Sequence, residues 1–424
     1  ERFTDEKFDQ LMTAWLDERA QGPEASPVLD AALARTSRTR PIPGWLLPER
    51  WIPMQLTARL QPVPRLAPIL LLIALLLALA VTIFVVGSQR HLPPPFGLAA
   101  PGSLAFVADG HIWMANPDGS GRVQLTSAQR LDAFPVFSRD GTKIAFKRLP
   151  EPNSIPNWQE WGDVVVADVD GRNPIVLDPM VHSPSPMSWS GDGRFIVYAR
   201  TLGTVDQVFI AATDGSSTRP VTSGAESNWG PTLSPDGRTI AYVKDYSGYS
   251  VIFVIQVDGT GERQITKVRI DAFDMAEWSP DATTLLFGAG KAEEGREDLF
   301  TVRLDGKPEQ RIIGNPGNDS GPTWSPDGRR IAYLNTLVGG KTRVIVALPD
   351  GSGPHPISDP GNWSYPFWSP DARHVLAVDG RLDGGQPIVA ILDSLGQSPA
   401  SSFALPGAPG DGPEPMAWQR RAAP

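Results

Sequence analysis

The sequence contains no cysteine. This absence excludes disulfide bonds, thiol catalysis and cysteine-ligated zinc sites. Histidine is scarce too, and none of the five histidines (91, 111, 182, 355 and 374) forms a closely spaced metal-binding pair with another. Positively charged residues are fewer than negatively charged ones, and the net charge is −9. Residues 1–67 carry equal numbers of both, so the excess negative charge lies in the rest of the chain. Such an acidic chain is poorly suited to general nucleic-acid binding, which depends on cationic contacts to phosphate.

Charge is absent altogether from residues 68–87, which read PILLLIALLLALAVTIFVVG. A helix of about 20 apolar residues spans about 30 Å, the thickness of a bilayer core. Arg50, Arg59 and Arg65 precede this segment, whereas Arg90 alone follows it closely. Because positive charge favours the cytoplasmic side, we predict a single transmembrane helix with the N-terminus in the cytoplasm and the remainder outside.

The segment before the predicted span divides into a helical part, residues 1–40, and a proline-rich juxtamembrane linker, residues 41–67. Residues 4–20 carry apolar side chains at helical spacing, and a second short helix is expected after Ser26. Two such helices bury little surface alone, so they are expected to contact a partner or the membrane. The segment resembles the cytoplasmic tails of membrane-anchored anti-sigma factors, which implies a cytoplasmic regulator as partner. A plain anchor is the alternative.

Glycine (41) and proline (43) are abundant, and a repeat explains where many of them lie. The repeat recurs at intervals of roughly 45 residues, the length of a propeller blade. Its copies are FSRDGTKIAF (137–146), WSGDGRFIVY (189–198), LSPDGRTIAY (233–242), WSPDATTLLF (278–287), WSPDGRRIAY (324–333) and WSPDARHVLA (368–377). The Ser-Pro-Asp-Gly type of sequence predicts a tight turn between two strands.

Each full unit continues with a third strand that ends in Asp-Gly or a similar turn and with a short fourth strand. The first unit, which begins at residue 102, lacks an opening strand, and the last has only an opening strand around Trp418. Pairing these two halves closes a ring and removes exposed edges. We therefore predict an all-β, seven-bladed propeller over residues 102–420, joined to the span by a linker, residues 88–101. Six blades remain the alternative if unit 368–405 is irregular.

These WSPDG, IAY and DG motifs resemble the TolB-like propeller repeat, a relative of the WD-type propeller, over residues 102–420. The resemblance implies the propeller fold and says less about function, because propellers host both binding and catalysis. TolB itself is periplasmic, carries a different N-terminal domain and is usually six-bladed. This chain departs from that pattern, so the resemblance does not carry a role in the Tol system.

No catalytic signature accompanies the propeller motifs. The GxSxG sequence of hydrolases that follow a propeller is absent. The DSGP string at residues 319–322 is interpreted as a loop variant of the repeat, because triads are recognised by geometry. The recurring aspartates, such as Asp236 and Asp327, are interpreted as turn residues and not as calcium ligands. We predict no catalytic residue, no metal and no cofactor.

The candidate binding residues lie in the loops that enter each inner strand, because the repeat brings these loops to one mouth of the central channel. Aromatic side chains beside carboxylates are suited to holding a peptide or a sugar. Trp158 and Trp161, in the long loop 148–162, are further candidates because insertions often fall on a binding face. The mouth candidates are Asp132, Phe134, Asn228, Trp229, Asp271, Phe273, Asp319, Trp363 and Tyr365.

The sequence thus favours a membrane-anchored, extracytoplasmic propeller that binds an outside protein, peptide or glycan without catalysis. One alternative is a transmembrane signalling regulator in which the propeller senses and residues 1–40 hold a cytoplasmic partner. Another is a hydrolase or lyase with its site at the channel mouth, where Asp132, Asp271 and Asp319 would act.

Overall fold

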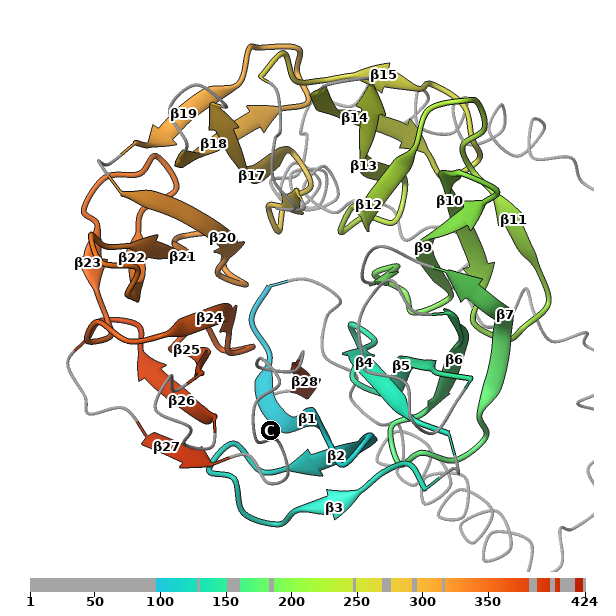
Figure 1. Ribbon diagram of the computed structural model, residues 1–424, viewed down its shortest axis with the longest axis horizontal. Helices are drawn as coiled ribbons and strands as arrows, with labels where there is room; N and C mark the ends of the chain where they lie inside the picture. The colour runs from blue at the N-terminus through green and yellow to red at the C-terminus, as the bar shows by residue number, and fades with distance from the viewer. Residues whose placement is uncertain are drawn as a thin grey trace, which may run out of the picture. The chain divides into compact units, whose positions relative to one another are not determined.

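In the computed structural model, the described residues form a ring of β-sheets around a central axis (Figure 1). They all lie in the unit Arg90–Pro424. The predicted segments 1–40, 41–67 and 68–87, and most of linker 88–101, lie outside the described residues. Across the ranges that are described, no helix is long and apolar enough to cross a bilayer. The described ranges are 97–127, 130–150, 161–182, 187–246, 249–268, 276–291, 296–314, 317–380, 387–396, 401–404 and 416–421.

Seven four-stranded antiparallel sheets make the ring, so the prediction of seven blades is confirmed. The first, innermost strands are β28 (Ala417–Arg421), β4 (Asp132–Phe137), β8 (Ser188–Trp189), β12 (Asn228–Leu233), β16 (Glu277–Trp278), β20 (Asn318–Trp324) and β24 (Trp363–Trp368). The second strands are β1 (Ala100–Ala108), β5 (Lys143–Arg148), β9 (Phe195–Leu202), β13 (Thr239–Tyr246), β17 (Thr284–Lys291), β21 (Ile331–Thr336) and β25 (His374–Asp379).

The third strands are β2 (His111–Ala115), β6 (Trp161–Asp168), β10 (Val205–Ala212), β14 (Tyr249–Gln256), β18 (Arg296–Arg303), β22 (Thr342–Ala347) and β26 (Ile388–Asp393). The fourth strands, on the rim of the ring, are β3 (Val123–Gln124), β7 (Ile175–His182), β11 (Thr218–Pro220), β15 (Arg263–Gln264), β19 (Gln310–Ile313), β23 (His355–Pro356) and β27 (Ser401–Ala404) (Figure 1). Strands β24 to β27 form a complete sheet, which excludes the six-blade alternative.

The ring closes as predicted, because C-terminal strand β28 pairs with β1 and completes the first blade. Leu104 lies opposite Trp418 in this pairing, and Ala100 lies opposite Arg421. The Gln419 side chain reinforces the closure: its Nε2 donates to the Gly141 carbonyl of the second blade at 2.8 Å. The edge of β1 is thereby covered, and no blade depends on a partner molecule to complete its sheet.

The hydrophobic core consists of seven clusters, and each cluster joins two neighbouring blades. Three of the tryptophans that begin a repeat pack in such a cluster and donate a hydrogen bond to the preceding blade. Trp189 Nε1 donates to Val136 O at 3.0 Å, Trp278 Nε1 to Thr232 O at 3.1 Å, and Trp368 Nε1 to Thr323 O at 3.2 Å. The indoles of Trp189, Trp278 and Trp368 are therefore both packed and hydrogen-bonded.

The turn aspartates have the role that the sequence predicted for them. In the turn at Ser325, the Asp327 carboxylate accepts a hydrogen bond from Ser325 Oγ at 2.6 Å and from Arg329 N at 3.1 Å. The same Ser-to-Asp bond recurs in the turns of the other full blades, at Asp140, Asp192, Asp236, Asp281 and Asp371. These carboxylates are thus committed to turn geometry.

Glycine at the fourth position of this turn has the same backbone conformation in different blades, but the space around it differs. Gly141 and Gly237 share the same left-handed backbone, with φ of 69° and 70°. A Cβ on Gly141 would lie 2.0 Å from Arg420 O of the closing strand, whereas a Cβ on Gly237 would have no neighbour within 4 Å. We expect Gly141→Ala to lower the free energy of unfolding by about 2 kcal/mol more than Gly237→Ala, because only the former forces β28 away.

Equilibrium urea unfolding of the full chain, followed by tryptophan fluorescence, measures this difference. Equal losses in the two alanine variants would mean that the closing strand accommodates the extra methyl group.

Candidate functional site

The predicted mouth residues that the structure describes lie at the end of the ring where the first strands begin. Four of them lie opposite a residue of the second strand of their own blade, in equivalent register. The pairs are Asp132 with Arg148, Asn228 with Lys244, Asp319 with Asn335, and Trp363 with Asp379. The structure thus brings these four predicted residues to the same end of the blades, while Asp271, Phe273 and Trp158 lie outside the described residues.

The carboxylate of Asp132 is held inside its blade by an arginine. Its two oxygens accept hydrogen bonds from Arg148 Nε at 2.7 Å and Nη2 at 3.1 Å, and Asp132 is 0% exposed. A second pair reinforces this end of the blade, because Arg130 Nη1 lies 2.8 Å from Asp163 Oδ2. Asp132 therefore acts as a buried structural anion with a bidentate partner.

Asn228 and Asp319 are likewise buried and hydrogen-bonded. Asn228 Nδ2 donates to Gln207 Oε1 of the preceding blade at 3.0 Å. Asp319 Oδ1 accepts from Asn335 Nδ2 at 2.8 Å. Buried polar side chains of this kind stabilise the blades when they are paired and offer little surface to a ligand.

Two mouth residues adopt a backbone that other blades reserve for glycine. The first strands β4, β12, β20 and β24 each contain a bulge at the same position. Blades with Gly230 and Gly321 there have φ of 59° and 56°, and Phe134 and Tyr365 are held at 59° and 50°. The left-handed region costs a non-glycine residue about 1–2 kcal/mol. Phe134 recovers stability by burial, but Tyr365 is 48% exposed and gains much less.

Exposed aromatic rings surround this end of the ring. Trp161 is 49% exposed and lies 5.4 Å from the His182 ring, and Trp229 and Trp363 are half-buried. Tyr249 was not among the predicted residues; it is 37% exposed and stacks on Tyr246 at 5.2 Å. The YSGY sequence at residues 246–249 signals it, because a hairpin tip leaves its side chains exposed. We name Trp161, Trp229, Tyr249, Trp363 and Tyr365 the mouth surface.

A second group of charged residues lies on elements around the axis, and the sequence analysis did not single it out. Glu277 is on β16, Arg139 is in the turn after β4, and Arg420 is on β28. Two of them depart from the repeat: Glu277 is the sole carboxylate in its repeat position, and Arg139 replaces the turn proline. These substitutions could have drawn attention to the residues in the sequence. The repeat places the residues on three different blades, however, so it does not predict that they interact.

The surroundings of this axial group perturb its protonation. Burial raises the pKa of the Glu277 carboxyl to about 7, although hydrogen bonds from Trp324 N and Thr323 Oγ1 and the charge of Arg139 oppose the shift. Burial also lowers the pKa of Arg420 to about 10, and the charge of Arg139 adds to that shift. Glu277 bridges two blades, since its oxygens accept from Trp324 N at 2.9 Å and Thr323 Oγ1 at 3.3 Å.

No group of three or more potential metal ligands occurs among the residues that the structure describes. The buried carboxylates Asp132 and Asp319 contact an arginine and an asparagine. A resident metal site is therefore not identified in this part of the chain.

Comparison with known proteins places this geometry in a family context. Residues 153–292 match the family model described as the TolB beta propeller domain. The chain contains a TolB-like β-propeller. A protein TolB homologue of Chlorobium luteolum is 34% identical over 70 residues, which are 16% of this chain and 15% of that protein. The alignment thus spans a small part of this TolB relative.

Solved structures share the fold of the TolB-like propeller. TolB of Acinetobacter baumannii has 16% identity and a TM-score of 0.51, with 74% of this chain and 81% of that chain covered. Oligogalacturonate lyase of Vibrio parahaemolyticus has 13% identity and a TM-score of 0.53, with 72% and 90% covered. At such identities the likeness concerns the fold alone. Because both TolB and an enzyme share this fold, the fold does not decide between binding and catalysis.

The Asp132–Arg148 pair gives a prediction about the TolB-like propeller's stability. We expect Asp132→Ala to lower the free energy of unfolding by about 3 kcal/mol, because it leaves a largely buried guanidinium without its carboxylate. Urea unfolding of the full chain measures the loss. Asp170→Ala is the matched control, since Asp170 forms an exposed pair with Arg172 at 3.6 Å and should leave stability almost unchanged. A small loss for Asp132→Ala would instead leave this carboxylate available for another role.

The Glu277 carboxyl gives a prediction about pH. Its folded-state pKa of about 7 lies above the ordinary value of 4.5, so the folded protein retains a proton that the unfolded chain releases between these values. The free energy of unfolding should therefore fall as pH rises through this window. We expect Glu277→Gln to be more stable than the unsubstituted chain by about 2 kcal/mol at pH 8 and nearly equal to it at pH 4.5.

Urea unfolding at a series of pH values tests this difference, with Asp350→Asn as the control. Hydrogen bonds from Ser352 lower the pKa of Asp350 from 3.8, so its effect on stability is confined to more acidic solutions. A Glu277→Gln variant that follows the unsubstituted chain at every pH would contradict the assignment.

Proposed function

We propose that this chain is a membrane-anchored, extracytoplasmic propeller that binds a protein or peptide at the mouth surface and performs no catalysis itself. The observation that carries the proposal is Tyr365, a strained residue whose ring is nevertheless 48% exposed. Strain that folding does not require is a sign of function. Exposed tyrosine and tryptophan rings are also the side chains that most often anchor protein interfaces.

The placement of polar groups supports binding over catalysis at this end of the ring. Asp132 and Asp319 are buried and paired within their blades, so they are not positioned to exchange protons with a ligand. Residues 68–87 support the membrane anchor through their length and lack of charge, and the arginines that precede them support a cytoplasmic N-terminus.

One observation favours a second function, a lyase or hydrolase that works through the channel. The Glu277 carboxyl, with a pKa of about 7, has the proton affinity of a general acid or base at neutral pH. However, both of its oxygens already accept hydrogen bonds from the neighbouring blade, which a bridging residue also explains. Binding at the mouth surface is therefore the function that we propose.

The proposal predicts that capture of a partner depends on Tyr365. The full chain, carrying an affinity tag, is treated in its own cells with a cross-linker that does not cross the inner membrane. We expect a cross-linked protein whose yield falls about tenfold or more in Tyr365→Gly, because an aromatic anchor is removed. The stability of this variant should be unchanged or higher, since glycine adopts the positive φ without strain.

Leu395→Ala is the matched control: Leu395 is 55% exposed, in the turn between β26 and β27 at the other end of the blades. Equal capture by Tyr365→Gly and the unsubstituted chain would count against the mouth surface. Capture of a cytoplasmic protein alone, through residues 1–67, would favour the signalling regulator.

A further inference from the structure

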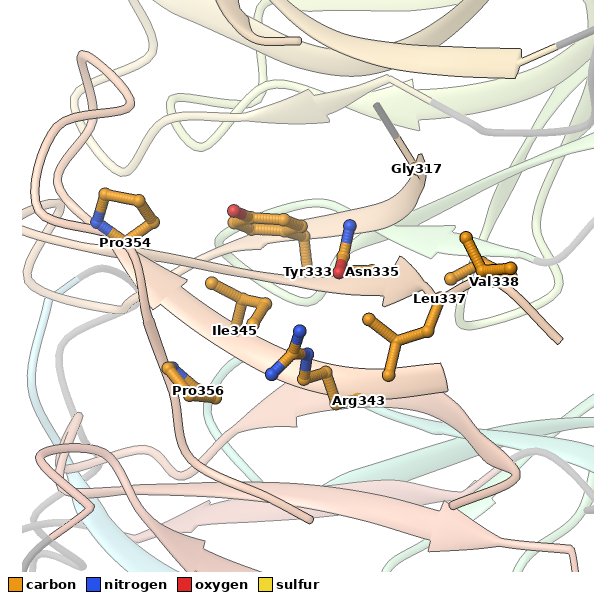
Figure 2. Close-up of a pocket in the computed structure, with 10 residues that line it drawn as sticks. Gly317, Tyr333, Asn335, Leu337, Val338, Arg343, Ile345, Pro354 and Pro356 are labelled. Atoms are coloured by element: carbon orange, nitrogen blue, oxygen red, sulfur yellow. The ribbon is translucent and has the colours of Figure 1, made fainter. Parts of the chain in front are cut away.

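A cavity of about 420 Å³ opens on the sixth blade, formed by strands β20 to β23 (Figure 2). Ligand pockets in proteins are commonly between about 300 and 1,000 Å³. Much of the wall is apolar, with Ile345, Pro354 and Pro356 on one side and Leu337 and Val338 toward the end of β21. Since one water takes about 30 Å³ of liquid, the cavity has room for about a dozen ligand atoms.

Arg343 is the single ionisable cation in the lining, and the lining contains no carboxylate. Its guanidinium lies toward the space beneath Tyr333 and Asn335 (Figure 2). The Arg343 Nε atom is buried and has no hydrogen-bond partner among the described residues, and no ion pair of Arg343 is found there. Arg343 is half-buried, and guanidinium groups held partly out of water are normally paired, so this one is suited to an anion supplied from outside the chain.

The fourth blade explains why the cavity exists here. In that blade, Tyr242 and Lys244 on β13 both donate to the carboxylate of Glu262, with Lys244 Nζ at 2.8 Å. Glu262 directly precedes the fourth strand of its blade. The internal carboxylate thus occupies the position next to the tyrosine.

The sixth blade keeps the tyrosine and changes the other two residues. Tyr333 remains, but Asn335 stands in place of Lys244, and Pro354, directly before β23, stands in place of Glu262. The residue opposite this rung changes from Val251 to Arg343. The blade has therefore lost its internal carboxylate and gained a cation on the adjacent strand.

The nearest rung carboxylate does not replace the missing one. Asp319 is bonded to Asn335 Nδ2 at 2.8 Å, and in register Asn335 lies between Asp319 and Arg343. No ion pair joins Asp319 to Arg343 within the described residues. The positive charge of Arg343 thus remains available to the cavity.

We propose that this cavity binds the carboxylate of a small ligand with an apolar body, through Arg343. The apolar body would contact Ile345, Pro354 and Pro356. Two sources carry this chemistry: a free small carboxylic acid, and the C-terminal carboxylate of a peptide whose last side chain is apolar. The site goes beyond the proposed mouth surface, and it does not depend on Tyr365.

The test uses the full chain and two matched probes, 3-phenylpropanoate and its neutral amide, in a saturation-transfer NMR titration. We expect the carboxylate to bind about tenfold or more tightly than the amide, because it alone forms a charge-assisted pair. Arg343→Gln should remove this preference and leave amide binding unchanged. Arg329→Gln, an exposed arginine in the same blade and outside the lining, should keep it.

A second pair of variants keeps the test valid if Arg343→Gln fails to fold. Val338 is fully exposed at the edge of the cavity, so Val338→Lys and Val338→Glu should both fold. The first should tighten and the second weaken carboxylate binding by a few-fold, through the sign of the added charge.

Equal affinity for carboxylate and amide, carboxylate binding by Arg343→Gln equal to that of the unsubstituted chain, or no binding of either probe would overturn the proposal. A Gly-Gly-Phe peptide and its C-terminal amide distinguish the two sources. Tighter binding of the free peptide than of phenylpropanoate would support it and assign a peptide terminus, and the reverse would support it and assign a small acid. Because these probes do not require the mouth surface, the outcome is separate from the Tyr365 capture experiment.

Discussion

The pairing of β28 with β1 is the contact on which the remainder of the ring depends. A propeller blade has two apolar faces, and each is buried only against a neighbouring blade. Seven clusters serve seven blade interfaces here, so an unclosed ring would expose apolar surface on both of its open sides. The first and last strands of the propeller meet in one blade, and Gln419 binds the second blade as well. Closure therefore completes the first sheet and also buries the apolar faces of the first blade against the seventh and second blades.

Repetition of the framework lets the chemistry of one position vary without changing the fold. The same rung holds an aspartate–arginine pair at Asp132, an amide pair at Asn228 and an aspartate–asparagine pair at Asp319. Each of these residues gains at least one hydrogen bond with a neighbouring polar side chain. A residue that differs from this pattern can be recognised by comparison with the equivalent positions of the other six blades. Arg343 is one such residue, and Tyr365, with its positive φ, is another.

The mouth and the axis differ in what they offer to a ligand. At the mouth, Asp132 and Asp319 are buried, whereas Trp161 and Tyr365 are exposed, and exposed aromatic rings are typical of an interface. Near the axis, burial shifts the pKa values of Glu277 and Arg420, and the charge of Arg139 acts on both groups. Perturbed groups of this kind also occur in structural networks, and the bonds from Glu277 to the next blade fit that role.

The sequence by itself determined the blades, because turn residues and alternating strands act locally and repeat along the chain. It also placed Asp132, Asn228, Asp319 and Trp363 at one mouth, since equivalent repeat positions must lie at equivalent heights in a ring. Only the tertiary structure decided what those residues do. Whether Asp132 is free or paired depends on the register of β4 against β5, which a bulge shifts between Ala133 and Val136.

The axial group and the cavity of the sixth blade were beyond the sequence for a related reason. Glu277, Arg139 and Arg420 belong to different blades, and the curvature of the whole ring sets which of them interact. The cavity beside Arg343 depends on the space left by Pro354. Its walls come from three strands, so its size is set by how these strands pack and cannot be predicted from the sequence alone. Local preferences in the chain specify the blades, whereas contacts between distant segments decide where charge is left unpaired.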